Sequence, residues 1–178
     1  MDKYIFRKKR ALTDLHCNIL IKYYEDRNIQ HNEEFYEDDI REYSALSTTL
    51  NRDKFLSLWD ILEVNIREYA SLHKFLKSGY EWKLRSYFNI QKYEPGRCYK
   101  MEHCEHSPEY SQRILGWMVY LNNIKKGGGT CWPQQNFKSK PRIGDLYIWP
   151  AAWTHSHYGI VAPHENKYIL TGWCNWLN

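Results

Sequence analysis

The stretch His103-Cys104-Glu105 contains two side chains that can bind a metal ion. A histidine and a carboxylate two residues apart point to the same face of a β-strand, so both can reach one ion. A second histidine near the C-terminus, at position 155 or 157, can supply the third ligand. Two histidines and one carboxylate occupy one face of an octahedral Fe(II) ion and leave three positions open. These residue types therefore indicate oxygen chemistry at iron rather than a structural metal.

The His-x-Glu spacing is not specific by itself. With 8 His and 21 Asp+Glu in 178 residues, about one such pair is expected by chance. His31 and Glu33 form a second copy, at the start of an acidic run from Glu33 to Glu42 that predicts a solvated loop. The pair at 103 and 105 instead lies among segments with strand-like patterns, and this setting distinguishes it.

A zinc site is the alternative for the same region. Its ligands would be Cys98, His103, Cys104 and His106, but their spacing matches no short-spaced structural zinc pattern. The five cysteines contain no C-x-x-C pair and no regular disulfide framework. We therefore rank iron above zinc, and we expect free thiols in a reducing compartment, the cytoplasm, or the host cytoplasm if the protein is viral.

Length and composition favour one β-rich domain. A chain of 178 residues suits a single core, and 8 Trp and 15 Tyr fit half-buried sheet surfaces and cleft walls. The net charge of +4 is too small to indicate nucleic acid binding, and the basic run at 7–10 is expected to be solvated surface. No apolar segment reaches the roughly 18 residues of a membrane span, and the N-terminus lacks the apolar core of a signal peptide. We expect a soluble, intracellular protein, and its oligomeric state stays open.

Two helices are expected in the N-terminal half. The first covers residues 13–25, with an apolar face at three-to-four residue spacing made of Leu12, Leu15, Ile19 and Tyr23. The second follows an apolar stripe from Phe55 to Leu76 and ends at Lys77-Ser78-Gly79, a cationic last turn with a glycine stop.

From Trp82 onward the apolar period becomes two. This pattern predicts a strand from Trp82 to Ile90, then a Pro95-Gly96 turn, and further strands at 113–122, 146–149 and 167–173. Short strands separated by glycine and proline turns indicate an α+β chain with a mainly β core, a sandwich or jelly roll, with the helices packed outside. We expect one domain over residues 1–178, in which 1–80 are mainly helical support and 81–178 form the core with the metal site.

Several short motifs follow one another in a definite order in the C-terminal half, and such an ordered set is far more specific than any single motif. They are Tyr93-x-x-Gly96, His103-x-Glu105, Tyr120-Leu121-Asn122, Gly128-Gly129-Thr130, Lys140-Pro141-x-x-Gly144, Trp149-Pro150, His157-x-Gly159 and Lys167-Tyr168-Ile169. This set resembles the Fe(II)- and 2-oxoglutarate-dependent dioxygenases, most closely their prolyl 4-hydroxylase-like branch with its small phage-type members. The resemblance covers about residues 93–173.

The resemblance implies a double-stranded β-helix whose open end holds Fe(II) through His103, Glu105 and His157. In this branch a basic residue follows the distal histidine by about ten positions and binds the far carboxylate of 2-oxoglutarate. That interval fits His157 and Lys167, whereas His155 lies two residues further away. The resemblance also implies O2 as the second co-substrate and ascorbate as a reductant.

Further co-substrate residues follow from the resemblance. Tyr93 and Tyr120 match tyrosines that line the co-substrate pocket in related hydroxylases. We also assign Thr171 to this pocket, with Trp173 as a second wall residue.

The role of Lys167 also follows from strand alternation. In a regular last strand, Lys167, Ile169, Thr171 and Trp173 share one face. If that face lines the barrel interior, a lysine there is costly unless an anion pairs with it. A dicarboxylate co-substrate would supply the anion.

Two positions depart from the commoner family pattern. Glu105 stands where aspartate is usual, so its extra methylene must be accommodated for the carboxylate to reach the metal. Lys167 stands where arginine is usual, although lysine is typical of the prolyl 4-hydroxylase branch; lysine acts as a point charge rather than a bidentate fork.

The function that we expect is hydroxylation of a C–H bond, of a prolyl residue in a peptide or protein, with release of succinate and CO2. Two alternatives remain: a 2-oxoglutarate dioxygenase of a small molecule or nucleobase, and a catalytically silent binding module on the same fold. The first alternative ranks higher, although the arginine-rich segment expected of nucleic acid demethylases is missing.

Overall fold

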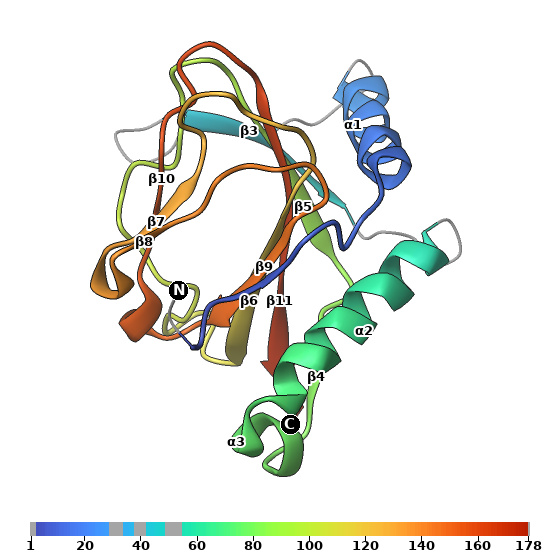
Figure 1. The fold of residues 1–178 in the computed structure, drawn as a ribbon, viewed down its shortest axis with the longest axis vertical. Helices are drawn as coiled ribbons and strands as arrows, with labels where there is room; N and C mark the ends of the chain where they lie inside the picture. Colours follow the sequence, from blue (N-terminus) through green and yellow to red (C-terminus); the bar gives the residue numbers. More distant parts are fainter. Residues whose placement is uncertain (1–2, 29–33, 38–41, 49–54, 178) are drawn as a thin grey trace.

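The computed structural model describes residues 3–28, 34–37, 42–48 and 55–177, and its core is two antiparallel sheets that curl around a common interior (Figure 1). The larger sheet has the strand order β1-β9-β6-β11-β5-β3-β2, with β4 also paired to β11, and the smaller has the order β10-β7-β8. The strands are β1 (Phe6–Lys8), β2 (Glu34–Glu37), β3 (Glu42–Thr48), β4 (Trp82–Leu84), β5 (Phe88–Tyr93), β6 (Arg113–Tyr120), β7 (Thr130–Trp132), β8 (Phe137–Lys138), β9 (Leu146–Pro150), β10 (Tyr158–Gly159) and β11 (Lys167–Trp176).

The helices α1 (Asp14–Asn28), α2 (Leu56–Ser71) and α3 (Lys74–Ser78) lie outside the sheets (Figure 1). Two short 3-10 helices, η1 (Pro133–Gln135) and η2 (Trp153–His155), occur in the connections after β7 and β9. The prediction of a mainly β core with N-terminal helices packed on its outside is therefore confirmed.

The large sheet has two buried faces. One face packs against α1 and α2 in an apolar cluster that includes Trp117, Ile148 and Leu170. The other face points to the interior between the sheets and carries a second cluster, which includes Trp149 and Ile169. Since side chains alternate along a strand, each central strand contributes to both clusters. The functional side chains described below lie on the interior face.

The burial of α1 differs from the prediction. Leu15 and Ile19 are 67% and 46% exposed, and the buried residues of this segment are Leu12, Cys17, Leu20 and Tyr24. Apolar residues occur on two sides of this helix, so periodicity alone did not identify the face that meets the sheet. The packing partner decides, because the ring of Tyr24 contacts Tyr168 on β11 and the Tyr168 hydroxyl donates a 2.6 Å hydrogen bond to Glu25.

Three predicted elements were wrong in their limits. The helix predicted from Phe55 to Gly79 is split at Leu72 and His73 into α2 and α3, although Gly79 ends α3 as expected. The strand predicted from Trp82 to Ile90 is two strands, β4 and β5, which both pair with β11. The acidic run from Glu33 to Glu42, predicted as a loop, contains β2 and the first residue of β3, whereas His31 and Glu33 lie outside the described residues.

The two sides of α1 predict different mutational effects. Replacing the buried Leu20 by alanine is expected to lower the free energy of unfolding by about 2–5 kcal/mol, because a core cavity replaces the side chain. Replacing the exposed Leu15 by alanine is expected to change it by less than about 0.5 kcal/mol. Urea unfolding of both variants measures the difference, and equal effects would contradict the observed orientation of α1.

None of the helices among the described residues is long and apolar enough to cross a membrane.

Candidate metal centre

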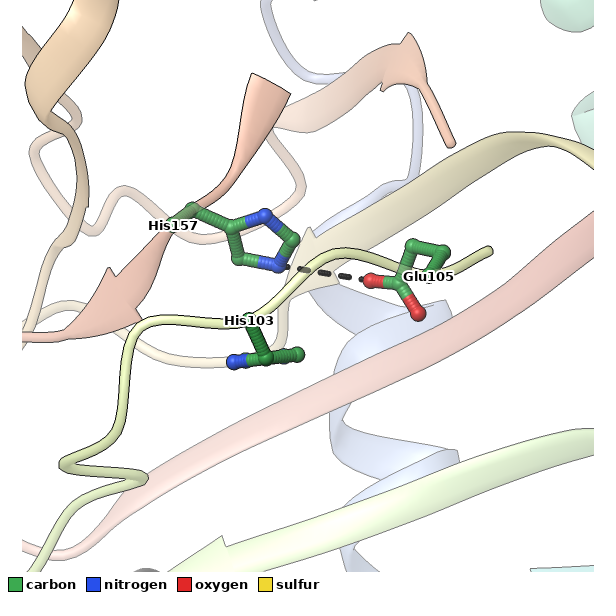
Figure 2. Close-up of side chains that lie close together, drawn as sticks. All are labelled: His103, Glu105 and His157. Carbon is green, nitrogen blue, oxygen red and sulfur yellow. Dashed lines mark ion pairs between the residues drawn. The ribbon is translucent and has the colours of Figure 1, made fainter. Parts of the chain in front are cut away.

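The side chains of His103, Glu105 and His157 lie close together (Figure 2). Their potential ligand atoms all lie within 4.8 Å of one another, and they are the one group of three or more such residues in the described part of the chain. His157 Nε2 lies 3.3 Å from Glu105 Oε1. Three ligand atoms that converge on one point fit the 2-His-1-carboxylate arrangement of non-haem Fe(II).

An isolated antiparallel bridge positions the two histidines. The backbone N–H of His103 donates to His157 O at 3.0 Å, and the N–H of His157 donates back to His103 O at 2.8 Å. Beyond this bridge, the N–H of Glu105 donates to Ala151 O at 3.1 Å. The strand expected around 103–105 is thus a single bridge pair, yet His103 and Glu105 still point to the same side, as Figure 2 shows.

Backbone carbonyls fix the orientation of both imidazole rings. His103 Nδ1 lies 3.0 Å from Met101 O, and His157 Nδ1 lies 3.0 Å from His155 O. A carbonyl only accepts, so each Nδ1 carries the proton and each Nε2 keeps a lone pair. This outer arrangement is typical of metal-binding histidines. Burial also lowers the pKa of His103, an effect that the nearby His157 reinforces, so the ring is held neutral and ready to bind a metal.

The carboxylate of Glu105 is buried but charged. The Trp173 indole N–H donates to Oε2 at 2.6 Å, and Arg113 lies 3.9 Å from the same oxygen. Burial works to raise the pKa of Glu105, but the neighbouring imidazoles of His157 and His103 and the Trp173 N–H bond outweigh it and lower the pKa to about 2. An anionic oxygen therefore faces both histidines at neutral pH.

The other candidate ligands do not join this group. His155 lies in η2, not on a strand with His157, and its ring meets Tyr4 edge-on while Nδ1 lies 3.0 Å from the hydroxyl of Thr154. His106 is exposed, and the thiol of Cys104 donates to the His106 backbone carbonyl at 3.1 Å. Of the two positions that the sequence offered, 155 and 157, the structure groups only His157 with His103 and Glu105.

A cavity of about 390 Å³ adjoins the three side chains. Lys167, Ile169, Thr171 and Trp173 of β11 all line it, as the strand alternation predicts. The cavity thus contains the proposed metal ligands and, on β11, the basic residue assigned to the keto acid.

Lys167 is a buried cation in this cavity. It is 3% exposed, and its Nζ lies 4.0 Å from the ring centroid of Tyr93, its register partner on β5. Within the described ranges it forms no ion pair. Burial lowers its pKa to about 8, with a smaller opposing effect from Cys98. Burying an ammonium group without a carboxylate partner among the described residues is costly, and an anionic ligand would offset that cost.

The three remaining co-substrate candidates differ in position. Tyr93 lines the cavity and its hydroxyl donates to Gln91 Oε1 at 2.8 Å. Thr171 also lines it, although its hydroxyl donates to the Trp117 backbone carbonyl at 2.9 Å. Tyr120 is fully buried and is not among the cavity-lining residues.

The hydroxyl of Tyr120 lies 2.6 Å from Ser139 Oγ and 3.3 Å from Thr130 Oγ1. Thr130 itself lines the cavity. The structure therefore places Tyr120 behind Thr130: the phenol contacts a residue that lines the cavity but does not line the cavity itself.

Sequence reasoning missed several residues of this site. Arg113, at the start of β6, has its guanidinium 3.7 Å from the ring centroid of Trp173 and 3.8 Å from that of Tyr110. The ring of Tyr99 packs against that of His103 at a centroid distance of 4.0 Å, tilted by 31°. These contacts join separate segments, and no local motif indicates them. The alternation of β11 did predict the position of Trp173, but not its bond to Glu105.

Comparison with known proteins identifies related sequences. Residues 88–175 match the sequence profile described as the 2OG-Fe(II) oxygenase superfamily. A probable prolyl 4-hydroxylase 9 of Arabidopsis thaliana is 27% identical over 48% of this chain and 39% of its own length. A putative prolyl 4-hydroxylase of Acanthamoeba polyphaga mimivirus is 31% identical over 47% of this chain and 42% of its own length. The chain thus matches about two fifths of each of these curated relatives.

Solved structures show the same fold over nearly the whole chain. A viral collagen prolyl hydroxylase of Paramecium Bursaria Chlorella virus-1 superimposes with a TM-score of 0.75 at 18% identity, covering 98% of this chain and 97% of its own. A prolyl-4-hydroxylase of Pseudomonas putida gives 0.73 at 17% identity, covering 98% and 94%. A prolyl hydroxylase of Trichoplax adhaerens, in complex with a hypoxia inducible factor peptide, gives 0.75 at 15% identity, covering 97% and 84%. The predicted jelly roll is confirmed.

Proposed function

Because this chain belongs to the 2OG-Fe(II) oxygenase superfamily through residues 88–175, we propose that it hydroxylates a prolyl residue of a peptide or protein. The observation that carries the proposal is the presence, in one cavity, of a converging His-Glu-His group and a buried lysine that pairs with no anion among the described residues. A metal ligand set and an anion site in one cavity are what chelation of a keto acid requires. The curated relatives, named as prolyl 4-hydroxylases, support the substrate class.

In this proposal His103, Glu105 and His157 hold Fe(II) and Lys167 holds the far carboxylate of 2-oxoglutarate. The iron supplies the oxidative chemistry with O2, in which 2-oxoglutarate becomes succinate and CO2 and the substrate gains a hydroxyl group. The protein contributes position: both histidines present Nε2, and the buried walls exclude water. Ascorbate is proposed as the reductant that keeps the iron in the Fe(II) state.

Each proposed co-substrate residue has a defined task. Lys167 pairs with the anion in a buried setting, where the ring of Tyr93 shields it from water. Tyr93 offers its phenol at the cavity wall, and Thr171 adds a small wall between Lys167 and Trp173. Tyr120 supports the hydroxyl of Thr130 from behind.

One group of cavity-lining residues is proposed to contact a peptide substrate. Tyr110, Arg113 and Trp173 all line the cavity, and Tyr110 is 47% exposed. Arg113 lies between the two aromatic rings, where its guanidinium can donate to a peptide carbonyl while the rings pack on a prolyl ring. We propose this group as the substrate contact.

The domain organisation and the location in the cell are also proposals. We propose that residues 1–178 form one domain in which α1 and α2 support the large sheet. We propose a cytoplasmic location, or the host cytoplasm for a viral protein, because Cys17, Cys98, Cys104, Cys131 and Cys174 are all free thiols.

Purified protein with Fe(II), ascorbate and 2-oxoglutarate tests the function. We expect succinate formation that increases when proline-containing peptides are added, together with a mass increase of one oxygen atom on a prolyl residue. Turnover that occurs only with a small molecule or nucleobase would reject the peptide substrate. Failure of Fe(II) and 2-oxoglutarate to bind at all would reject the enzyme.

A further inference from the structure

We propose that Gly116 and Trp173 position the carboxylate of Glu105, and that together they form a site matched to the length of a glutamate. The proposal rests on the proposed metal centre and adds two residues to it. We call Gly116 and Trp173 the Glu105 cradle. One member leaves space for the side chain, and the other holds one of its oxygens.

Gly116 provides the space. It lies in the middle of β6, and its register partners are Trp149 on β9 and Trp173 on β11. A Cβ atom at this position would lie 2.9 Å from Glu105 Cγ and 2.9 Å from two ring carbons of Trp149. Carbon atoms in contact lie about 3.5–4.0 Å apart, so either neighbour would have to move. Trp149 is 2% exposed and packs against Trp132 and His157, so a shift of its ring would disturb these contacts.

The backbone does not explain this glycine. The glycines with positive φ are Gly96, Gly127, Gly128 and Gly144, and Gly116 is not among them. Any residue could therefore adopt its extended conformation as part of a regular strand. What the missing side chain supplies is the volume that the Cγ methylene of Glu105 fills.

Trp173 holds one carboxylate oxygen of Glu105 through a hydrogen bond. Its indole N–H donates to Glu105 Oε2 at 2.6 Å, whereas the indole N–H groups of Trp117, Trp132 and Trp149 have no hydrogen-bond partner in the described residues. With Oε2 bound to Trp173, Oε1 is the oxygen left to face the histidines, 3.3 Å from His157 Nε2. The geometry therefore assigns Oε1 as the metal ligand and Oε2 as the anchored oxygen.

The cradle predicts that an aspartate is a poor replacement in this chain. An aspartate carboxylate ends one carbon–carbon bond, about 1.5 Å, closer to the backbone. It can then approach either the histidines or the Trp173 N–H, but not both in the observed geometry. Glu105→Asp is therefore expected to bind metal more weakly than the wild type, although its charge is unchanged.

Calorimetric titration with Mn(II), at a temperature well below unfolding, tests the cradle with matched controls. Trp173→Phe, Gly116→Ala and Glu105→Asp are each expected to lose about tenfold or more in metal affinity, the range for outer-shell changes. The control for Trp173→Phe is Trp117→Phe, which removes an unpaired N–H from a fully buried indole. The control for Gly116→Ala is Gly172→Ala, whose new Cβ would meet the Trp117 ring on the other side of the sheet. Both controls are expected to lower the unfolding temperature and to keep the wild-type metal affinity.

The visible spectrum of the Co(II)-loaded protein adds a measurement that does not change when a substitution lowers only the stability of the fold. It should change in Trp173→Phe and stay as in the wild type in Trp117→Phe. If the wild type binds no divalent metal, the metal centre itself is rejected, and the proposed function with it. If the wild type binds metal and both Trp173→Phe and Glu105→Asp bind it equally well, the cradle is rejected and the metal centre stands. If Gly116→Ala does not fold, Trp173→Phe and Glu105→Asp decide whether the cradle positions the carboxylate.

Discussion

Glu105→Gln is expected to abolish succinate formation. It should also lower Fe(II) affinity by more than about 10- to 100-fold, which is the loss that follows when a residue hydrogen-bonded to a metal ligand is removed. Glutamine keeps the shape of the side chain, and its amide oxygen can still accept the Trp173 hydrogen bond. What it removes is the single negative charge among the three proposed ligands. The measurement is a metal titration followed by a succinate assay on the same samples.

Glu33→Ala is the matched control for this prediction, because Glu33 belongs to the other His-x-Glu pair of the sequence. It is expected to leave metal binding and activity unchanged. The assignment of Glu105 would be wrong if Glu105→Gln kept wild-type affinity, or if Glu33→Ala lost it to the same degree.

Lys167→Met is expected to weaken binding of 2-oxoglutarate by about 100-fold or more while leaving Fe(II) affinity nearly unchanged. Removing one partner of a buried charge pair costs about 2–5 kcal/mol, and about 1.4 kcal/mol corresponds to tenfold. Methionine keeps an apolar stem against the Tyr93 ring, so the fold should survive. Calorimetry with the metal and then with the keto acid separates the two effects. An equal loss of both affinities would contradict the assigned role.

The same lysine predicts a pH dependence. In the free protein burial lowers the pKa of Lys167 to about 8, so the protonated form that binds the anion dominates below that pH. Affinity for 2-oxoglutarate should therefore be full below about pH 8 and should fall as the pH rises above it. Lys167→Met should lack this decline, whereas Lys92→Met, which changes an adjacent-strand lysine paired with Glu25, should retain it. A wild-type affinity that stays constant from pH 7 to about pH 9.5 would contradict an anion-binding role for a lysine with this pKa.

Much of the site could be predicted because it depends on short-range rules. The face shared by Lys167 and Trp173 follows from alternation along one strand, and the ten-residue interval from His157 to Lys167 selected the same histidine that the structure groups with His103. The resemblance to a known family supplied the ligand set. Composition alone would not have distinguished an iron site from a zinc site.

The parts that sequence reasoning missed depend on tertiary packing. The buried side of α1 is set by Tyr168 on β11, more than a hundred residues later in the chain. The position of Tyr120 behind Thr130 depends on how the two sheets face each other. The role of Gly116 could not be predicted either, since its contact with Glu105 requires the register of β6 between β9 and β11.

Anaerobic calorimetric titration of 2-oxoglutarate into the wild-type protein, with and without Fe(II), tests the central claim most directly. The claim is that one cavity binds the metal through His103, Glu105 and His157 and binds the keto acid through that metal and Lys167. We predict one 2-oxoglutarate per chain when Fe(II) is present and a much weaker interaction when it is absent. Equal affinity in the two titrations, or no binding in either, would contradict this account.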